Sequence, residues 1–175
     1  GSHIVIALQS IVSRNTDPTD QIVVSVTSFE TSSTAFNVIP QTVVLKGTVR
    51  TLSDETRDLA EKRLEEIARK TGDVFGANVD PVYTRGYPVM TNSVDQTEFA
   101  ASVAKSVSGY CEEAPLVMGG EDFSYMAIER PGAYILIGNG DSAPVHNPNY
   151  NFNDEAISIG CSWWAEIIEK RMPVS

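Results

Sequence analysis

The sequence lacks the features on which several functional classes depend. No apolar run approaches the roughly 20 residues that span a bilayer, and no charged segment leads into a short apolar stretch, so we expect neither a membrane protein nor a signal peptide. Lys and Arg number 13 against 23 Asp and Glu, which gives a formal net charge of -10. Because nucleic acids and anionic membranes attract basic surfaces, we expect neither as a partner. The expected location is the cytoplasm.

Cysteine and histidine are also scarce. Cys111 and Cys161 fit no CxxC spacing, which predicts two free, mostly packed thiols. Of the two histidines, His3 belongs to residues 1–3, Gly-Ser-His, which resemble the remnant of a cleaved affinity tag. No GxSxG motif is present and neither histidine has an evident acid partner, so Ser-His-Asp catalysis is not expected.

Hydrophobic periodicity and turn residues are present throughout the chain and predict alternating helices and strands. Ser53 is a plausible N-cap for a helix that ends near Gly72 and Gly76, and Asn153 is a plausible N-cap for the last helix. The predicted helices cover residues 4–12, 53–72, 94–107 and 154–171, and the predicted strands cover residues 21–30, 42–52, 78–88 and 133–140.

The order of these elements predicts an α+β protein. Residues 4–88 give helix, strand, strand, helix, strand, which is a ferredoxin-like βαββαβ unit with an antiparallel sheet and two helices, but without its first strand. Residues 89–175 form a second, α/β unit. A sheet without its first strand has an unpaired edge or a missing member.

His146 lies in VHNPNYNFND (145–154), an asparagine-rich loop before the last helix. A zinc site needs three or four ligands, and a histidine is more often simply hydrogen-bonded, so on this pattern both interpretations stay open. In MGGEDFSYM (118–126), Gly119 and Gly120 let backbone amides approach an anion; the alternative is a tight turn in which Glu121 and Asp122 cap the next helix.

Asn37, in the loop FNVIP, and Arg50, on the strand sequence GTVR, are an amide and a guanidinium that could converge on a carboxylate. Arg85 in TRGYP is a similar arginine at a strand end. The alternatives are a turn side chain for Asn37 and structural or surface ion pairs for the two arginines.

Six ordered blocks resemble the C-terminal half of an M20-family amidohydrolase, of the aminoacylase, hippurate hydrolase and auxin-conjugate hydrolase type. The resemblance covers nearly the whole chain, from about Ala7 to about Ile168. The blocks are ALQSIVSRNTDP, TAFNVIPQTVVLKGTVRTL, TRGYP, VMGGEDFSYM, RPGAYILIGNG and HNPNYNFNDEAI.

The resemblance implies a fold and a domain organisation. Residues 4–88 correspond to an incomplete lid that also forms the dimer contact, so a homodimer through the lid is expected. Residues 89–175 correspond to the incomplete, C-terminal α/β piece of a phosphorylase/hydrolase-like catalytic domain.

The same resemblance implies a chemistry and a set of site residues. The family hydrolyses the amide bond of N-acyl amino acids or small peptides with water activated by two divalent ions, which can be zinc, manganese, cobalt or nickel. By this resemblance His146 is a metal ligand, with Asn151 and Asn153 supporting its loop. The implied substrate-binding residues are Asn37, Arg50, Arg85, Gly119 and Gly120.

Departures from the family pattern limit what this chain is expected to do. The family's early metal ligands, the acidic pair with the general base, and the lid histidine would all precede Ile4. We therefore expect no catalytic base in this chain, no stoichiometrically bound metal and no hydrolysis by the chain alone. The alternative to an enzyme fragment is a non-catalytic dimerisation or interaction module.

Overall fold

The computed structural model describes residues 1–173, which divide into two compact units. Unit 1 consists of Gly1–Val89 together with Met118–Glu121, and unit 2 consists of Met90–Val117 together with the chain from Asp122 onward. Each unit mixes helix with extended or irregular chain, and only unit 1 contains a sheet among the described residues. The α+β class predicted from the sequence is therefore confirmed.

The sheet of unit 1 is a two-stranded antiparallel hairpin. Strand β1 (Ile22–Thr31) pairs with strand β2 (Val43–Thr51), and the register shifts at a bulge between Val26 and Ser28. Gly47 lies opposite this bulge, where a Cβ atom would stand 2.2 Å from a main-chain oxygen. Any larger residue at this position would therefore displace the strands.

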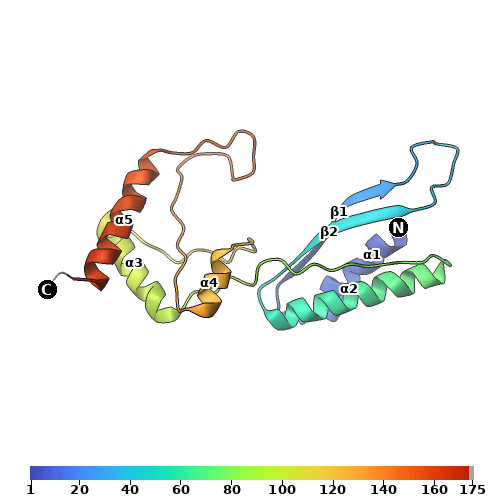
Figure 1. Ribbon diagram of the computed structural model, residues 1–175, viewed down its shortest axis with the longest axis horizontal. Coiled ribbons are helices and arrows are strands. Elements are labelled where there is room, and N and C mark those ends of the chain that lie inside the picture. Colours follow the sequence, from blue (N-terminus) through green and yellow to red (C-terminus); the bar gives the residue numbers. More distant parts are fainter. Residues whose placement is uncertain (174–175) are drawn as a thin grey trace. The chain divides into compact units, whose positions relative to one another are not determined.

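Two helical segments pack on one side of this hairpin (Figure 1). Helix α1 (Ser2–Ser10) continues into a π-helical turn, η1 (Ile11–Asn15), and α2 (Asp54–Val74) follows β2. Ser53 caps α2 as predicted, because its hydroxyl accepts the Thr56 N–H at 3.1 Å. Their shared core consists of Leu8, Ile11, Ile22, Val24 and Ala60.

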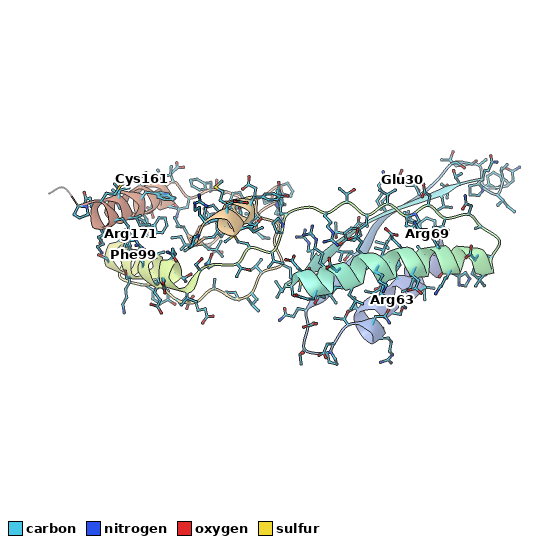
Figure 2. All side chains as sticks on the ribbon, turned by 60° about the horizontal axis from the view of Figure 1, so that its bottom comes forward. Glu30, Arg63, Arg69, Phe99, Cys161 and Arg171 are labelled. Atoms are coloured by element: carbon cyan, nitrogen blue, oxygen red, sulfur yellow. The ribbon has the colours of Figure 1, made fainter. Side chains whose placement is uncertain are left out.

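Unit 2 is built on two helices that lie side by side. The core between α3 (Val94–Ser108) and α5 (Glu155–Arg171) consists of Ala100, Val103 and Trp163, and the Trp163 indole donates to the Ala100 carbonyl at 3.1 Å. Figure 2 shows Arg171 of α5 beside Phe99 of α3, with the guanidinium carbon 4.0 Å from the ring centroid. The short helix α4 (Phe123–Glu129) lies between them in sequence.

Two of the four predicted strands do not form, and the predictions for residues 78–88 and 133–140 were wrong. A strand needs a partner for its main-chain groups, and among the described residues β1 and β2 pair only with each other. Residues 78–88 are instead attached to α2 by arginine side chains. In the second segment, the Asn92 side chain replaces a strand, donating to the Tyr134 oxygen at 3.0 Å and accepting its N–H at 2.8 Å.

Two smaller expectations also change. Cys111 and Cys161 are free, as predicted, but both are exposed rather than packed. Asn153 does cap the last helix, since its Oδ1 accepts the Glu155 N–H at 3.0 Å, although the helix begins at Glu155 rather than at Asp154. None of the described helices is both long enough and apolar enough to cross a bilayer.

Candidate functional site

His146 stands at the top of an exposed turn in unit 2. The turn is closed by the Asn147 N–H, which donates to the Pro144 carbonyl at 3.1 Å. His146 has a φ of +68°, and it is the only non-glycine among the described residues with positive φ. A β-carbon makes this left-handed conformation unfavourable, so the surrounding structure must hold it in place. Its side chain is exposed to solvent.

The asparagines expected to support this turn do so through different groups. Asn153 contributes its side chain, which caps α5, whereas Asn151 contributes its main chain, whose N–H donates to the Ser142 hydroxyl at 3.1 Å. Asn139 also bonds to this segment. The sequence analysis missed both Asn139 and Ser142. The signal that could have indicated Asn139 is the Asn-Gly pair that it forms with Gly140, which is typical of a turn. In the structure Gly140 has a φ of +77°.

The described residues fit the role of one metal ligand and not that of a complete metal centre. An accessible imidazole is an ordinary ligand for zinc, nickel or cobalt. Among residues 1–173, however, no group of three or more His, Cys, Asp or Glu side chains could hold a metal ion. His146 is thus a single donor, and the other donors of any centre would have to come from outside these residues.

Arg50 and the Gly119-Gly120 segment lie together in unit 1. Arg50, near the end of β2, donates from Nη1 to the Met118 carbonyl at 2.6 Å. Gly120 lies against the Tyr87 ring, where an added Cβ would come within 3.1 Å of a ring carbon. Two exposed glycines therefore follow the residue whose carbonyl binds the Arg50 guanidinium.

The Asp122 carboxylate does not cap the helix that follows. Asp122 precedes α4, but its side chain makes no capping hydrogen bond. The alternative of a side-chain cap is therefore wrong for Asp122.

Asn37 is not brought together with Arg50. Asn37 lies in the exposed turn between the strands, where the Val38 N–H donates to the Ala35 carbonyl at 3.3 Å. Arg50 lies at the other end of β2, paired with Val23. At about 3.3 Å per residue, the strand between them spans roughly 20 Å, so the two side chains of one chain cannot hold the same small carboxylate.

Arg85 is bound by two carboxylates of α2. Its Nε donates to Glu61 at 2.7 Å and its Nη2 donates to Asp58 at 2.6 Å. The hydrogen bonds that Arg85 donates, to Asp58 first and to Glu61 second, raise its pKa above the ordinary value. Beside it, the Arg57 guanidinium donates to the Gly86 carbonyl at 2.9 Å. Arg85 therefore attaches residues 78–88 to α2. Of its three guanidinium nitrogens, only Nη1 takes no part in these contacts.

Tyr83, two residues before Arg85, is partly buried. Desolvation raises the pKa of Tyr83, opposed by the nearby Arg57 charge.

Comparison with known proteins places these residues in one family. The profile of peptidase family M20/M25/M40 matches residues 3–170. The hippurate hydrolase of Campylobacter jejuni is 35% identical over 173 residues, which are 97% of this chain and 45% of that protein. An N-acetyldiaminopimelate deacetylase of Enterococcus faecalis is 34% identical over 154 residues, which are 87% of this chain and 40% of that protein.

The fold is also shared with a solved structure. A Bacillus subtilis protein, described as a dinuclear metal binding peptidase of the M20 family, superposes with a TM-score of 0.75 at 27% identity. The match covers 95% of this chain and 43% of that structure. The chain thus spans less than half the length of the relatives it matches, and it belongs to peptidase family M20/M25/M40.

Proposed function

We propose that this chain is part of a metal-dependent amidohydrolase that cleaves the amide bond of N-acyl amino acids or small peptides in the cytoplasm. The observation that carries the proposal is the exposed imidazole of His146, held on a structured loop in a chain of this family. The relatives named for hippurate and N-acetyldiaminopimelate support the substrate class, because both compounds are N-acylated amino acids.

In the proposed enzyme His146 is one ligand of a centre of two divalent ions, which can be zinc, manganese, cobalt or nickel. Such ions lower the pKa of water and stabilise an oxyanion. This chain contributes the imidazole and the loop that orients it. Because one imidazole cannot hold two ions, the 175-residue chain alone binds no stoichiometric metal and has no activity.

Substrate recognition is assigned to the residues of unit 1. Arg50 and the amides of Gly119 and Gly120 form the anion-binding group for the substrate carboxylate or the scissile carbonyl. Arg85 contributes through Nη1, the nitrogen that Asp58 and Glu61 leave unused.

Asn37 is assigned to substrate binding across a dimer. Since Asn37 and Arg50 stand at opposite ends of one hairpin, they can contact one substrate only if they come from two copies of the chain. A homodimer formed through the lid provides that arrangement. The loop that carries Asn37 has two almost fully exposed apolar side chains, Phe36 at 101% and Ile39 at 93%, which a second copy would cover.

The same exposed loop favours the second candidate, a non-catalytic dimerisation or interaction module. The two candidates differ in whether His146 matters. A module needs the hairpin and its loop, whereas an amidohydrolase also needs the imidazole.

The test uses the natural polypeptide that carries this chain, purified as wild type, as His146→Asn and as Asn149→Ala, a matched change in the same exposed loop. Hydrolysis of hippurate and N-acetylated amino acids is measured with bound-metal analysis. We expect His146→Asn to lose metal and activity while Asn149→Ala keeps both. Equal metal content and activity in all three proteins would refute the proposal.

Metal analysis of the isolated 175-residue chain, with its intact mass, provides a second test. We expect no stoichiometric metal. Two tightly bound ions in this chain would contradict the assignment of a single ligand.

A further inference from the structure

The loop that carries His146 is closed at its base by one asparagine side chain. Asn139 donates from Nδ2 to the Asn151 carbonyl at 2.7 Å, and its Oδ1 accepts the Asn153 N–H at 2.8 Å. One amide thus bonds two main-chain groups that lie two residues apart. This is the pattern a neighbouring strand would supply, and it fixes both the distance and the register of the two loop ends.

A hydroxyl adds a second connection further into the loop. Ser142 accepts the Asn151 N–H at 3.1 Å, and its hydroxyl lies 3.1 Å from the Asn151 carbonyl. The main chain of Asn151 is therefore held from both Asn139 and Ser142. These bonds offset part of the entropy lost when the loop closes. They also shorten the free chain, so the turn that carries His146 has fewer accessible conformations.

The base of the loop is in turn attached to the helical core. Asn153, whose N–H binds Asn139, caps α5 with its own side chain. Helix α5 carries Trp163, which is 7% exposed and hydrogen-bonded to α3. A continuous set of contacts therefore runs from the buried core of unit 2 to the base of the His146 loop.

We propose that Asn139 is a positioning residue for His146: by joining the two ends of the loop, it holds the left-handed turn that presents the imidazole. The inference rests on the proposed function, in which this imidazole is a metal ligand. The Asn139 amide bonds main-chain groups of the loop, so its role is exerted through the loop. Partners of this kind typically change metal affinity or activity 10- to 100-fold when removed.

The first test needs no metal and uses the 175-residue chain. NMR couplings report the sign of φ at His146, and hydrogen exchange reports the Asn147 N–H that closes the turn. In Asn139→Ala we expect the positive-φ signature to be lost and this N–H to exchange at least tenfold faster. Asn149→Ala is the control, and the Trp163 indole signal verifies that unit 2 remains folded.

A graded variant separates the two bonds of the amide. Asn139→Asp keeps the acceptor for the Asn153 N–H but loses the donor to the Asn151 carbonyl. We expect exchange between that of the wild type and that of Asn139→Ala. An unchanged coupling and exchange rate at the turn in Asn139→Ala would overturn the proposal.

The second test uses the natural polypeptide and separates this inference from the proposed function. We expect Asn139→Ala to lower metal affinity and kcat by 10- to 100-fold with little change in KM, because the substrate contacts are elsewhere. If His146→Asn abolishes metal binding but Asn139→Ala does not weaken it, the positioning role is wrong and the proposed function stands. If His146→Asn leaves metal binding intact, the proposed function itself fails.

Discussion

The Arg50 guanidinium donates from Nη1 to the Met118 carbonyl, 2.6 Å away, and so joins residues that lie 68 positions apart in the sequence. The bond brings the Gly119-Gly120 segment to the end of β2 within unit 1. A charged donor on a main-chain acceptor is among the stronger hydrogen bonds, so Arg50 has a structural role whatever it binds.

Substitutions of Arg50 separate that structural role from substrate binding. We expect Arg50→Ala to release the segment, with lower NMR order parameters at the Gly119 and Gly120 amides of the 175-residue chain. Arg50→Lys can still donate to the Met118 carbonyl but lacks the planar fork that binds a carboxylate. We therefore expect Arg50→Lys to raise KM in the natural polypeptide while the glycine order parameters stay those of the wild type. A KM equal to that of the wild type would remove Arg50 from the substrate-binding set.

The core of unit 1 depends on Ile11, which has no exposed surface. We expect Ile11→Ala to lower the free energy of unfolding by about 2–5 kcal/mol, because a buried side chain is lost and a cavity remains. The measurement is urea denaturation followed by circular dichroism. Ile6→Ala is the matched control, since Ile6 is 69% exposed on the preceding helix and its loss should change little. Equal effects of the two changes would show that η1 is not packed as described.

The left-handed backbone of His146 predicts an unusual order among substitutions. Asn and Gly tolerate positive φ better than residues such as Ala, by about 1 kcal/mol. We therefore expect the Asn147 N–H, which closes the turn, to be better protected from exchange in His146→Gly and His146→Asn than in His146→Ala. Protection that is greatest in His146→Ala would contradict a positive φ at this position.

Glu166 links α5 to α3 in a way that depends on pH. The Lys170 ammonium first and the Ser106 hydroxyl second, both 2.6 Å away, hold the pKa of Glu166 below its ordinary value of 4.5. A folded-state pKa below the unfolded value adds stability above pH 4.5, and this contribution is lost as the pH falls through the folded-state pKa.

The pH effect can be isolated with Glu166→Gln. We expect the wild type to lose more thermal stability than Glu166→Gln between neutral pH and about pH 3, and the difference to develop below pH 4.5. Glu169→Gln on the same helix is the control, because Glu169 is exposed. Parallel stability curves for wild type and Glu166→Gln would show that the contacts of Glu166 with Lys170 and Ser106 add no pH-dependent stability.

Local patterns predicted local structure well. Ser53 begins α2 because its hydroxyl satisfies an N–H within three residues, and the alternating apolar residues of 21–30 and 42–52 need only each other to form a hairpin. Both signals lie within a short stretch of sequence. Periodicity alone could not show that residues 78–88 and 133–140 would find no strand partner, because pairing depends on what else the fold supplies.

The candidate site was predicted only in part for the same reason. The resemblance made His146 a candidate ligand, but a residue pattern does not reveal that the amide of Asn139 bonds to main-chain groups of Asn151 and Asn153 at the base of its loop. Likewise an ion pair was the alternative for Arg85, but the sequence did not indicate its partners, Asp58 and Glu61, which lie more than 20 positions earlier.

The bond between Trp163 and the Ala100 carbonyl also bears on how the chain folds. It joins residues 63 positions apart, whereas the hairpin of unit 1 pairs residues 12 to 29 positions apart, from Thr31 with Val43 to Ile22 with Thr51. Contacts between distant residues form slowly, because the intervening chain must first lose its freedom. We therefore expect the β1–β2 hairpin to form early in refolding, and the tryptophan fluorescence of unit 2 to change in a later, slower phase.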